Sequence, residues 1–266
     1  MADAEAAGAY AATNGRQTYY ESHGEGRPLF LLHGGVRASE MFEPLAATLA
    51  ETRRVVAVHL EGHGRTPDGG RPLRFESMAD DLAALIDHLG IERADLMGYS
   101  LGAGVAYQAA IRHPDRVRRL VVVSEPIRRD GWYPEVAASM SAMGPEAGAM
   151  MAQSPLAALY PDVDWSRLFG RLGDLLERDY DWSDDVSRIE APTMAIFADA
   201  DAVRPEHIVE VYRLLGGGRR DAGLDGSGRP TSRLAIVPGR THYDVLGFGG
   251  LASLVTDFLE TASEAG

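Results

Sequence analysis

The sequence predicts an α/β fold in which helices flank a mostly parallel sheet and a helical insertion interrupts the chain. Short apolar runs alternate with longer amphipathic stretches through most of the 266 residues. The runs are apolar on both faces and end at turn residues, as is typical of buried parallel strands. One long section without such runs contains all three tryptophans, which indicates an insertion between two strands.

Seven segments are expected to be strands. Residues 17–22 follow the turn Asn14-Gly15, so they are expected to form one arm of an antiparallel hairpin. The other segments are short, rich in leucine or β-branched residues, and expected to form the parallel sheet: residues 29–32, 55–60, 94–98, 120–123, 194–197 and 234–237.

Amphipathic stretches between these runs predict the helices, at residues 40–50, 75–89, 101–112, 205–215 and 245–261. Strands that alternate with helices favour a parallel sheet with helices on both faces. Residues 125–190 are expected to form a helical cap, and residues 1–124 and 191–266 the two parts of the core. The glycine-rich stretch 216–230 is expected to be a surface loop.

Composition excludes several kinds of chemistry. The chain has no cysteine, and all 26 basic residues are arginine, so thiolate catalysis, Schiff-base chemistry and a lysine-containing phosphate loop are excluded. Arginine as the sole basic residue besides histidine is typical of a GC-rich, bacterial genome.

The net charge indicates which partners to expect, and the N-terminal segment indicates the location. A net charge of -13 disfavours nucleic acid or an anionic membrane as a partner. The start, MADAEAAGAY, lacks a basic segment and a long apolar run, so no secretory signal is expected. We expect a cytoplasmic protein with a small-molecule substrate, no cofactor and no metal; the sequence does not predict the oligomeric state.

Ser100 is the strongest candidate nucleophile. It lies in the segment GYSLG, residues 98–102, between a predicted strand and a predicted helix. A serine on such a sharp turn has a strained backbone, and flanking glycines let the turn close. The helix that follows supplies free N–H groups for a developing oxyanion.

His242 is the candidate general base, because it follows the last predicted strand and should lie at the same sheet edge as Ser100. Asp199 and Asp201 follow the preceding strand, and either carboxylate could orient the imidazole. Glu125, after the strand before that, is a third candidate.

The oxyanion hole is expected to use backbone N–H groups from two turns. The segment His33-Gly34-Gly35 ends its strand at the same edge, and Gly35 is the favoured donor together with Leu101. The alternative is an ordinary glycine turn at Gly35, which would leave one donor.

The predicted cap contains aromatic and methionine side chains that could line an adaptable apolar pocket above Ser100. The favoured substrate-binding residues are Trp132, Met140, Met143 and Tyr160. The alternative, equally favoured, is that most of these side chains pack the cap against the core.

Taken together, these segments resemble the α/β-hydrolase superfamily over residues 17–262. The matching motifs are LLHGG (31–35), EGHGRT (61–66), GYSLG (98–102), DAD (199–201) and GRTH (239–242). The resemblance implies Asp201, rather than Asp199, as the acid of a Ser-His-Asp triad. The sequence departs from the family at His59, where aspartate is usual, and at Thr66, where serine is usual.

The segment His59-Leu60-Glu61-Gly62-His63 does not have the spacing of a helical HExxH zinc motif, so no metal is expected there. The overall prediction is a serine hydrolase that cleaves a carboxylic ester or lactone of a small to medium apolar substrate through an acyl-enzyme. The resemblance leaves three alternatives open: a carbon–carbon bond hydrolase, a cofactor-free perhydrolase, and a ligand-binding receptor without turnover.

Overall fold

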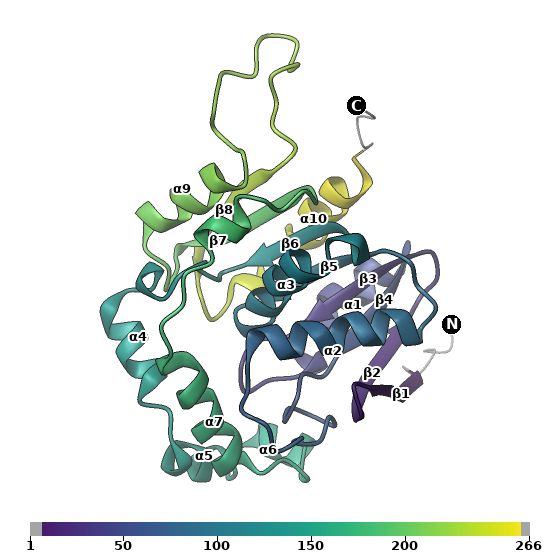
Figure 1. Cartoon of the computed structure of the whole chain (residues 1–266), viewed down its shortest axis with the longest axis vertical. Coiled ribbons are helices and arrows are strands. Elements are labelled where there is room, and N and C mark those ends of the chain that lie inside the picture. The colour runs from purple at the N-terminus through teal and green to yellow at the C-terminus, as the bar shows by residue number, and fades with distance from the viewer. Residues whose placement is uncertain (1–6, 262–266) are drawn as a thin grey trace.

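The predicted fold class is confirmed by a computed structural model, which describes residues 7–261. Residues 1–6, part of the segment inspected for a secretory signal, lie outside the described range. Eight strands form one sheet in the order β1-β2-β4-β3-β5-β6-β7-β8 (Figure 1). Their bounds are β1 Ala7–Thr13, β2 Arg16–His23, β3 Arg27–Leu32, β4 Arg53–Val58, β5 Ala94–Tyr99, β6 Val117–Val123, β7 Thr193–Ala200 and β8 Arg233–Thr241.

The hairpin expected at the N-terminal end is present. β1 pairs antiparallel with β2, and β2 pairs antiparallel with β4. From β4 across to β8 every pairing is parallel. The carboxyl ends of these parallel strands therefore share one edge of the sheet, where the turns that contain the candidate residues also lie.

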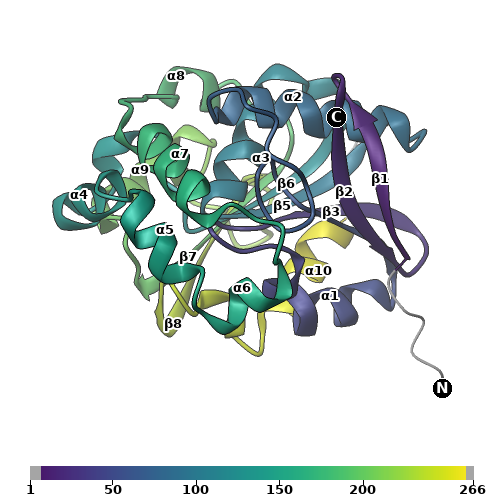
Figure 2. The ribbon, with the colours of Figure 1, turned by 90° about the horizontal axis from the view of Figure 1, so that it is seen from below.

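Helices cover both faces of the sheet (Figure 2). On one face, α1 (Glu43–Ala50) and α10 (Leu251–Glu260) bury leucine, valine and phenylalanine side chains. On the other face lie α2 (Phe75–His88), α3 (Leu101–Arg112) and α9 (Pro205–Leu214). The helix expected at residues 245–261 is two elements, η4 (Val245–Gly247) and α10. Gly249 and Gly250 separate them, since glycine favours a break over helix continuation.

Short helices connect β6 to β7. They are η3 (Arg129–Gly131), α4 (Pro134–Ser141), α5 (Pro145–Met151), α6 (Pro155–Leu159), α7 (Trp165–Glu177) and α8 (Ser183–Val186). Three of them begin at a proline, whose restricted φ and missing N–H suit the first helical position. Two more 3-10 turns, η1 (Ser39–Phe42) and η2 (Pro114–Arg116), lie elsewhere in the chain. The expected surface loop projects between α9 and β8 (Figure 1).

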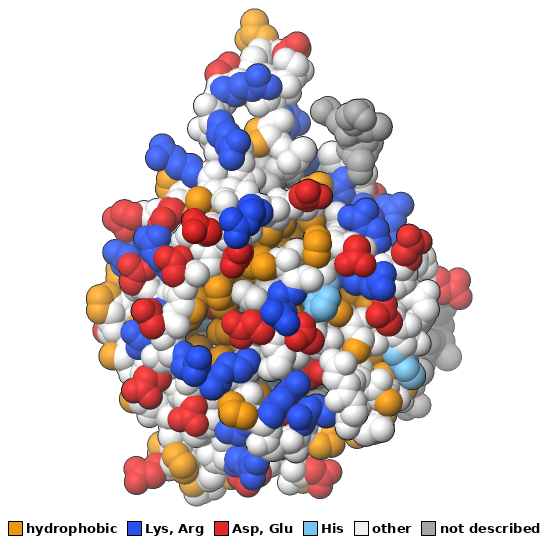
Figure 3. Space-filling view, viewed as in Figure 1, with side chains coloured by type: hydrophobic (Ala, Val, Ile, Leu, Met, Phe, Trp, Pro, Cys, Tyr) orange, Lys and Arg blue, Asp and Glu red, His pale blue; other side chains and the backbone are white. Residues whose placement is uncertain are grey.

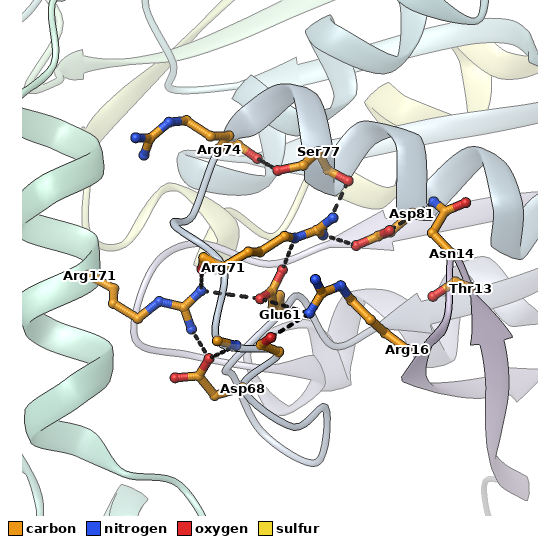
Figure 4. A network of polar contacts seen from close by, with 12 residues as sticks. Thr13, Asn14, Arg16, Glu61, Asp68, Arg71, Arg74, Ser77, Asp81 and Arg171 are labelled. Atoms are coloured by element: carbon orange, nitrogen blue, oxygen red, sulfur yellow. Dashed lines mark hydrogen bonds and ion pairs between the residues drawn. The ribbon is translucent and has the colours of Figure 1, made fainter.

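An ionic network attaches α7 to the core (Figure 4). The Glu61 carboxylate, which is 4% exposed, accepts hydrogen bonds from Arg71 at 2.7 Å and from Arg171 of α7 at 3.1 Å. Arg171 also pairs with Asp68, and Arg71 with Asp81. Arg16 lies 3.9 Å from the same carboxylate. Because the carboxylate is buried and has three cationic partners, this contact positions α7 over the carboxyl edge of the sheet.

The surface drawn in Figure 3 carries acidic and basic side chains interspersed, with apolar side chains between them. Among residues 7–261, no helix is both long and apolar enough to cross a membrane.

Candidate active site

Ser100 occupies a strained turn between β5 and α3. Its backbone has φ 50° and ψ -122°, a conformation that side-chain-bearing residues rarely adopt. Its N–H donates to the Val123 carbonyl at 2.9 Å, and its carbonyl accepts from the Ala103 N–H at 2.7 Å. The turn is therefore held on both sides, by β6 and by the first turn of α3.

Two glycines make this turn possible. A Cβ on Gly98 would lie 2.2 Å from the Gly102 carbonyl oxygen, and a Cβ on Gly102 would lie 2.1 Å from the Leu32 carbonyl oxygen. Both contacts are with backbone, which cannot move aside without displacing α3 in the first case or β3 in the second. The glycines of the GYSLG segment are thus required by close packing among β3, β5 and α3.

His242 follows β8 and contacts Asp201, which follows β7. The distance from His242 Nδ1 to Asp201 Oδ1 is 3.3 Å, and both side chains are buried. Asp199 is turned elsewhere: its carboxylate accepts from the N–H groups of Gly239 and Arg240, at 2.9 and 3.2 Å. Of the two aspartates considered, the structure brings Asp201 to the imidazole and uses Asp199 to bind the turn in β8.

The Asp201 carboxylate accepts hydrogen bonds from other groups besides His242. Its Oδ2 accepts from Ser124 Oγ at 2.6 Å and from the Ala198 N–H at 2.9 Å. Burial by itself would raise the pKa of Asp201, but the bonds from His242, Ser124 and Ala198 outweigh it and hold the pKa below the ordinary value. Asp201 is therefore ionised near neutral pH and places a negative charge beside the imidazole of His242.

Gly35 and Leu101 lie beside Ser100 on two different turns, and all three line one cavity. Within the described range, neither Gly35 nor Leu101 has a hydrogen-bond partner for its backbone N–H. Leu101 is the first residue of α3, where an N–H has no intrahelical partner. Two free donors are thus available next to the Ser100 side chain.

The cavity has a volume of about 560 Å³. Ser100 and His242 both line it, although the described residues show no hydrogen bond between their side chains; such contacts are often long without a ligand. Trp132, Met140 and Met143 from the insertion also line it, as do these further apolar residues: Met41, Pro44, Leu172, Leu176 and Leu246. The cavity is largely apolar, with Arg37, Arg240 and Asp244 among its polar residues.

Tyr160 is the exception among the expected pocket residues. It lines two other cavities, and its hydroxyl donates to Glu40 Oε2 at 2.8 Å. Its ring packs edge-on against His59, with 5.8 Å between centroids. The expectation for Tyr160 is corrected: this residue follows α6, contacts Glu40 and His59, and is not among the residues that line the cavity of Ser100.

Glu125, the third candidate acid, lines the cavity but does not bind His242. Its Oε1 accepts from the Tyr180 hydroxyl at 3.5 Å, and that hydroxyl accepts from Trp132 Nε1 at 3.3 Å. Burial, with a smaller contribution from the charge of Asp201, raises the pKa of Glu125 well above its ordinary value. Burial therefore favours the neutral form of the Glu125 carboxyl group at the wall of this largely apolar cavity.

The histidines near the strand ends have structural contacts. His33 Nδ1 donates to the Gly34 carbonyl at 2.8 Å, while Nε2 accepts from the Leu60 N–H at 2.9 Å. His59 accepts from the Arg65 N–H and donates to Ser39 Oγ. Burial lowers the pKa of His59 to about 3 and that of His63 to about 4. In residues 7–261, no three His, Asp or Glu side chains are grouped to hold a metal ion.

Two residues at the site had no distinguishing signal in the sequence. Ser124 has a positive φ of 54° and donates to Asp201. The Tyr99 hydroxyl donates to the His242 carbonyl at 2.7 Å, and its ring lies 5.4 Å from the imidazole. Both precede residues already singled out, but their partners lie far along the chain, so only the folded structure reveals the contacts.

Comparison with known proteins agrees with this geometry. A family model described as alpha/beta hydrolase fold matches residues 27–149. Pimeloyl-[acyl-carrier protein] methyl ester esterase of Neisseria meningitidis is 31% identical, over 88% of this chain and 93% of that protein. A 2-hydroxymuconate semialdehyde hydrolase of Pseudomonas sp. is 40% identical over 41% of this chain and 40% of its own.

A solved structure extends the likeness to the fold. The enol-lactonase of Burkholderia xenovorans has a TM-score of 0.72 and 22% identity, covering 94% of this chain and 99% of that one. At that identity the match supports the fold alone. The near full-length match to the Neisseria esterase, together with the family model and the serine turn, shows that this chain belongs to the α/β-hydrolase superfamily.

Proposed function

We propose that this hydrolase cleaves a carboxylic ester or lactone of a small to medium apolar substrate by acyl transfer to Ser100. The observation that supports this most is the environment of Ser100. Two backbone N–H groups that have no partner among residues 7–261, those of Gly35 and Leu101, lie in the same cavity as the strained serine and His242. This arrangement suits an oxyanion that forms on a carbonyl attacked by serine.

In the proposed reaction, Ser100 Oγ attacks the substrate carbonyl carbon while its proton passes to His242 Nε2. The oxyanion of the tetrahedral intermediate accepts hydrogen bonds from Gly35 and Leu101. The C–O bond to the leaving alcohol then breaks, and His242 returns the proton to that oxygen. Water activated by His242 hydrolyses the acyl-enzyme, and Asp201 keeps the imidazole in the required tautomer and stabilises its charge.

The lining of the cavity supports an apolar acyl group. Trp132, Met140, Met143, Leu172 and Leu176 surround a volume of about 560 Å³, within the usual range for a small-molecule site. Methionine side chains adapt to different shapes, which favours acceptance of several related acyl groups. The relatives named above act on a methyl ester in one case and carry the name of a lactonase in another.

A carbon–carbon bond hydrolase is the second candidate, favoured by the 40% identity to the 2-hydroxymuconate semialdehyde hydrolase over part of the chain. The same serine and oxyanion donors would serve that reaction. Assays with p-nitrophenyl esters, aliphatic lactones and a ring-fission dienoate separate the two: turnover of the dienoate alone would contradict the ester and lactone proposal.

The decisive first experiment is intact-mass spectrometry after treatment with a fluorophosphonate, on the wild type and on Ser100→Ala. A single adduct on the wild type that is absent from the variant is expected, because the reagent captures an activated serine. Labelling of the variant, or no labelling of a folded wild type, would contradict the nucleophile and would favour a ligand-binding role without turnover.

A further inference from the structure

A row of arginines lies at the edge of the sheet opposite Ser100. β3, β4 and β8 each begin at an arginine, Arg93 directly precedes β5, and Arg118 is the second residue of β6. Ser100 follows the carboxyl end of β5, whereas these arginines lie at the amino ends of the strands. The row therefore takes no part in the site described above.

The register of the strands places these arginines next to one another. Arg27 of β3 is directly paired with Arg53 of β4, and Leu29 is paired with Asp95 of β5, which places Arg93 level with Arg27. Like charges on directly adjacent positions of paired strands destabilise a sheet. Since neighbouring strands lie about 4.8 Å apart, the row from β4 through β3 and β5 to β6 spans about 14 Å.

Two acidic side chains, Asp95 and Glu260, contact arginines of this row. Asp95, fully buried, binds Arg53 at 2.8 Å and also pairs with Arg118. Glu260 lies 3.8 Å from Arg53 and is 56% exposed. For Arg27, the described residues provide neither an ion pair nor a side-chain hydrogen bond, and Arg93 donates only to the Val117 carbonyl, at 2.9 Å.

Among the groups that meet here, the four arginines Arg27, Arg53, Arg93 and Arg118 outnumber the carboxylates of Asp95 and Glu260, on a chain whose net charge is -13. The Nε atoms of Arg53, Arg118 and Arg119 are buried without a partner among the residues described. Burial lowers the pKa of Arg119, and the positive charges of nearby arginines lower it further. Burial also lowers the pKa of Arg53. Repulsion from Arg118 and Arg27 adds to this shift, and attraction to Asp95 opposes it.

The row surrounds a basin of about 680 Å³. Arg53, with a side chain only 3% exposed, lies beside the exposed Arg27 and Arg93. Thr52, Arg118 and Glu260 complete the polar lining. A guanidinium group binds a phosphate oxygen pair through two parallel N–H donors. From this geometry we infer that the basin is a binding site for a phosphate-bearing small molecule with two anionic groups, with Arg27 and Arg93 as its principal ligands.

Pyrophosphate is the probe for this site. Calorimetric titration at constant ionic strength is carried out on the wild type, on Arg27→Gln/Arg93→Gln, and on Arg219→Gln/Arg220→Gln, a control with the same charge change in the loop between α9 and β8. Saturable binding to the wild type and the control is expected, with affinity reduced at least about tenfold in the Arg27/Arg93 variant.

The melting temperature gives an independent measure. Without pyrophosphate the Arg27/Arg93 variant should be as stable as the wild type or more stable, because repulsion is relieved. With pyrophosphate only the wild type and the control should gain stability. The proposal is overturned if pyrophosphate does not bind saturably, or if the control variant loses as much affinity as the Arg27/Arg93 variant. It is also overturned if pyrophosphate binds only to a chain shortened to end at Thr261. Ser100→Ala should bind pyrophosphate unchanged, so the result is independent of the proposed hydrolysis.

Discussion

Asp201 Oδ1 lies 3.3 Å from Nδ1 of His242, although 41 positions of the chain separate the two residues. Ser124 and the Ala198 N–H bind the other oxygen of the same carboxylate, so the aspartate is held in place before any substrate binds. This contact makes the role of each aspartate in the DAD segment testable.

Asp201→Asn should lower kcat for ester hydrolysis by about 10³–10⁴-fold, because the amide neither holds the required imidazole tautomer nor stabilises its positive charge. Asp199→Asn is the matched control: its side chain binds the β8 turn through Gly239 and Arg240, so kcat should change little. Steady-state kinetics on both variants checks this. A large loss in Asp199→Asn with normal activity in Asp201→Asn would reverse the assignment.

Ser100→Gly should be more stable than Ser100→Ala by about 1 kcal/mol, because glycine adopts the φ of 50° without strain. Neither variant should form an acyl-enzyme. Urea unfolding of the two variants measures the difference between their free energies of unfolding. Both variants lack the serine hydroxyl, so the comparison isolates the backbone. Equal stability would show that the turn stores no strain at this residue.

Glu125→Gln should alter the pH dependence of stability. The folded protein holds a proton on Glu125 above the pKa of the unfolded chain, so wild-type stability should fall as pH rises from about 4.5 to the raised pKa of the folded state. Glutamine cannot ionise, so the variant should lose this slope and gain stability relative to wild type at alkaline pH. Melting temperatures across pH test the difference, with the exposed Glu135→Gln as control. Parallel slopes for all three proteins would mean that Glu125 is ionised in the folded state.

Glu61→Gln should destabilise the protein by about 3 kcal/mol, since it leaves three arginines beside a buried neutral group. The loss should be accompanied by a higher KM, because Arg171 attaches α7 to the core and Leu172 of the same helix lines the cavity. Chemical unfolding and esterase kinetics measure the two effects. Glu177→Gln, an exposed change on the same helix, should alter neither.

The sequence by itself determined the succession of strands and helices and the turn that contains Ser100. Periodicity and turn residues act over a few neighbouring positions, so runs such as 94–98 and 101–112 could be located without tertiary information. The ends of elements were less well determined: the last predicted helix is divided at Gly249 and Gly250.

Tertiary structure decided which distant side chains meet. The pairing of β7 with β8 shifts register between Ala198 and Ala200, and at this irregularity Asp199 contacts β8 while Asp201 contacts His242. The direction of Tyr160 and the alignment of Arg27 with Arg53 likewise depend on how separate segments pack. Local sequence specifies which way the backbone turns, whereas register and packing between segments far apart in the chain determine which polar groups become neighbours.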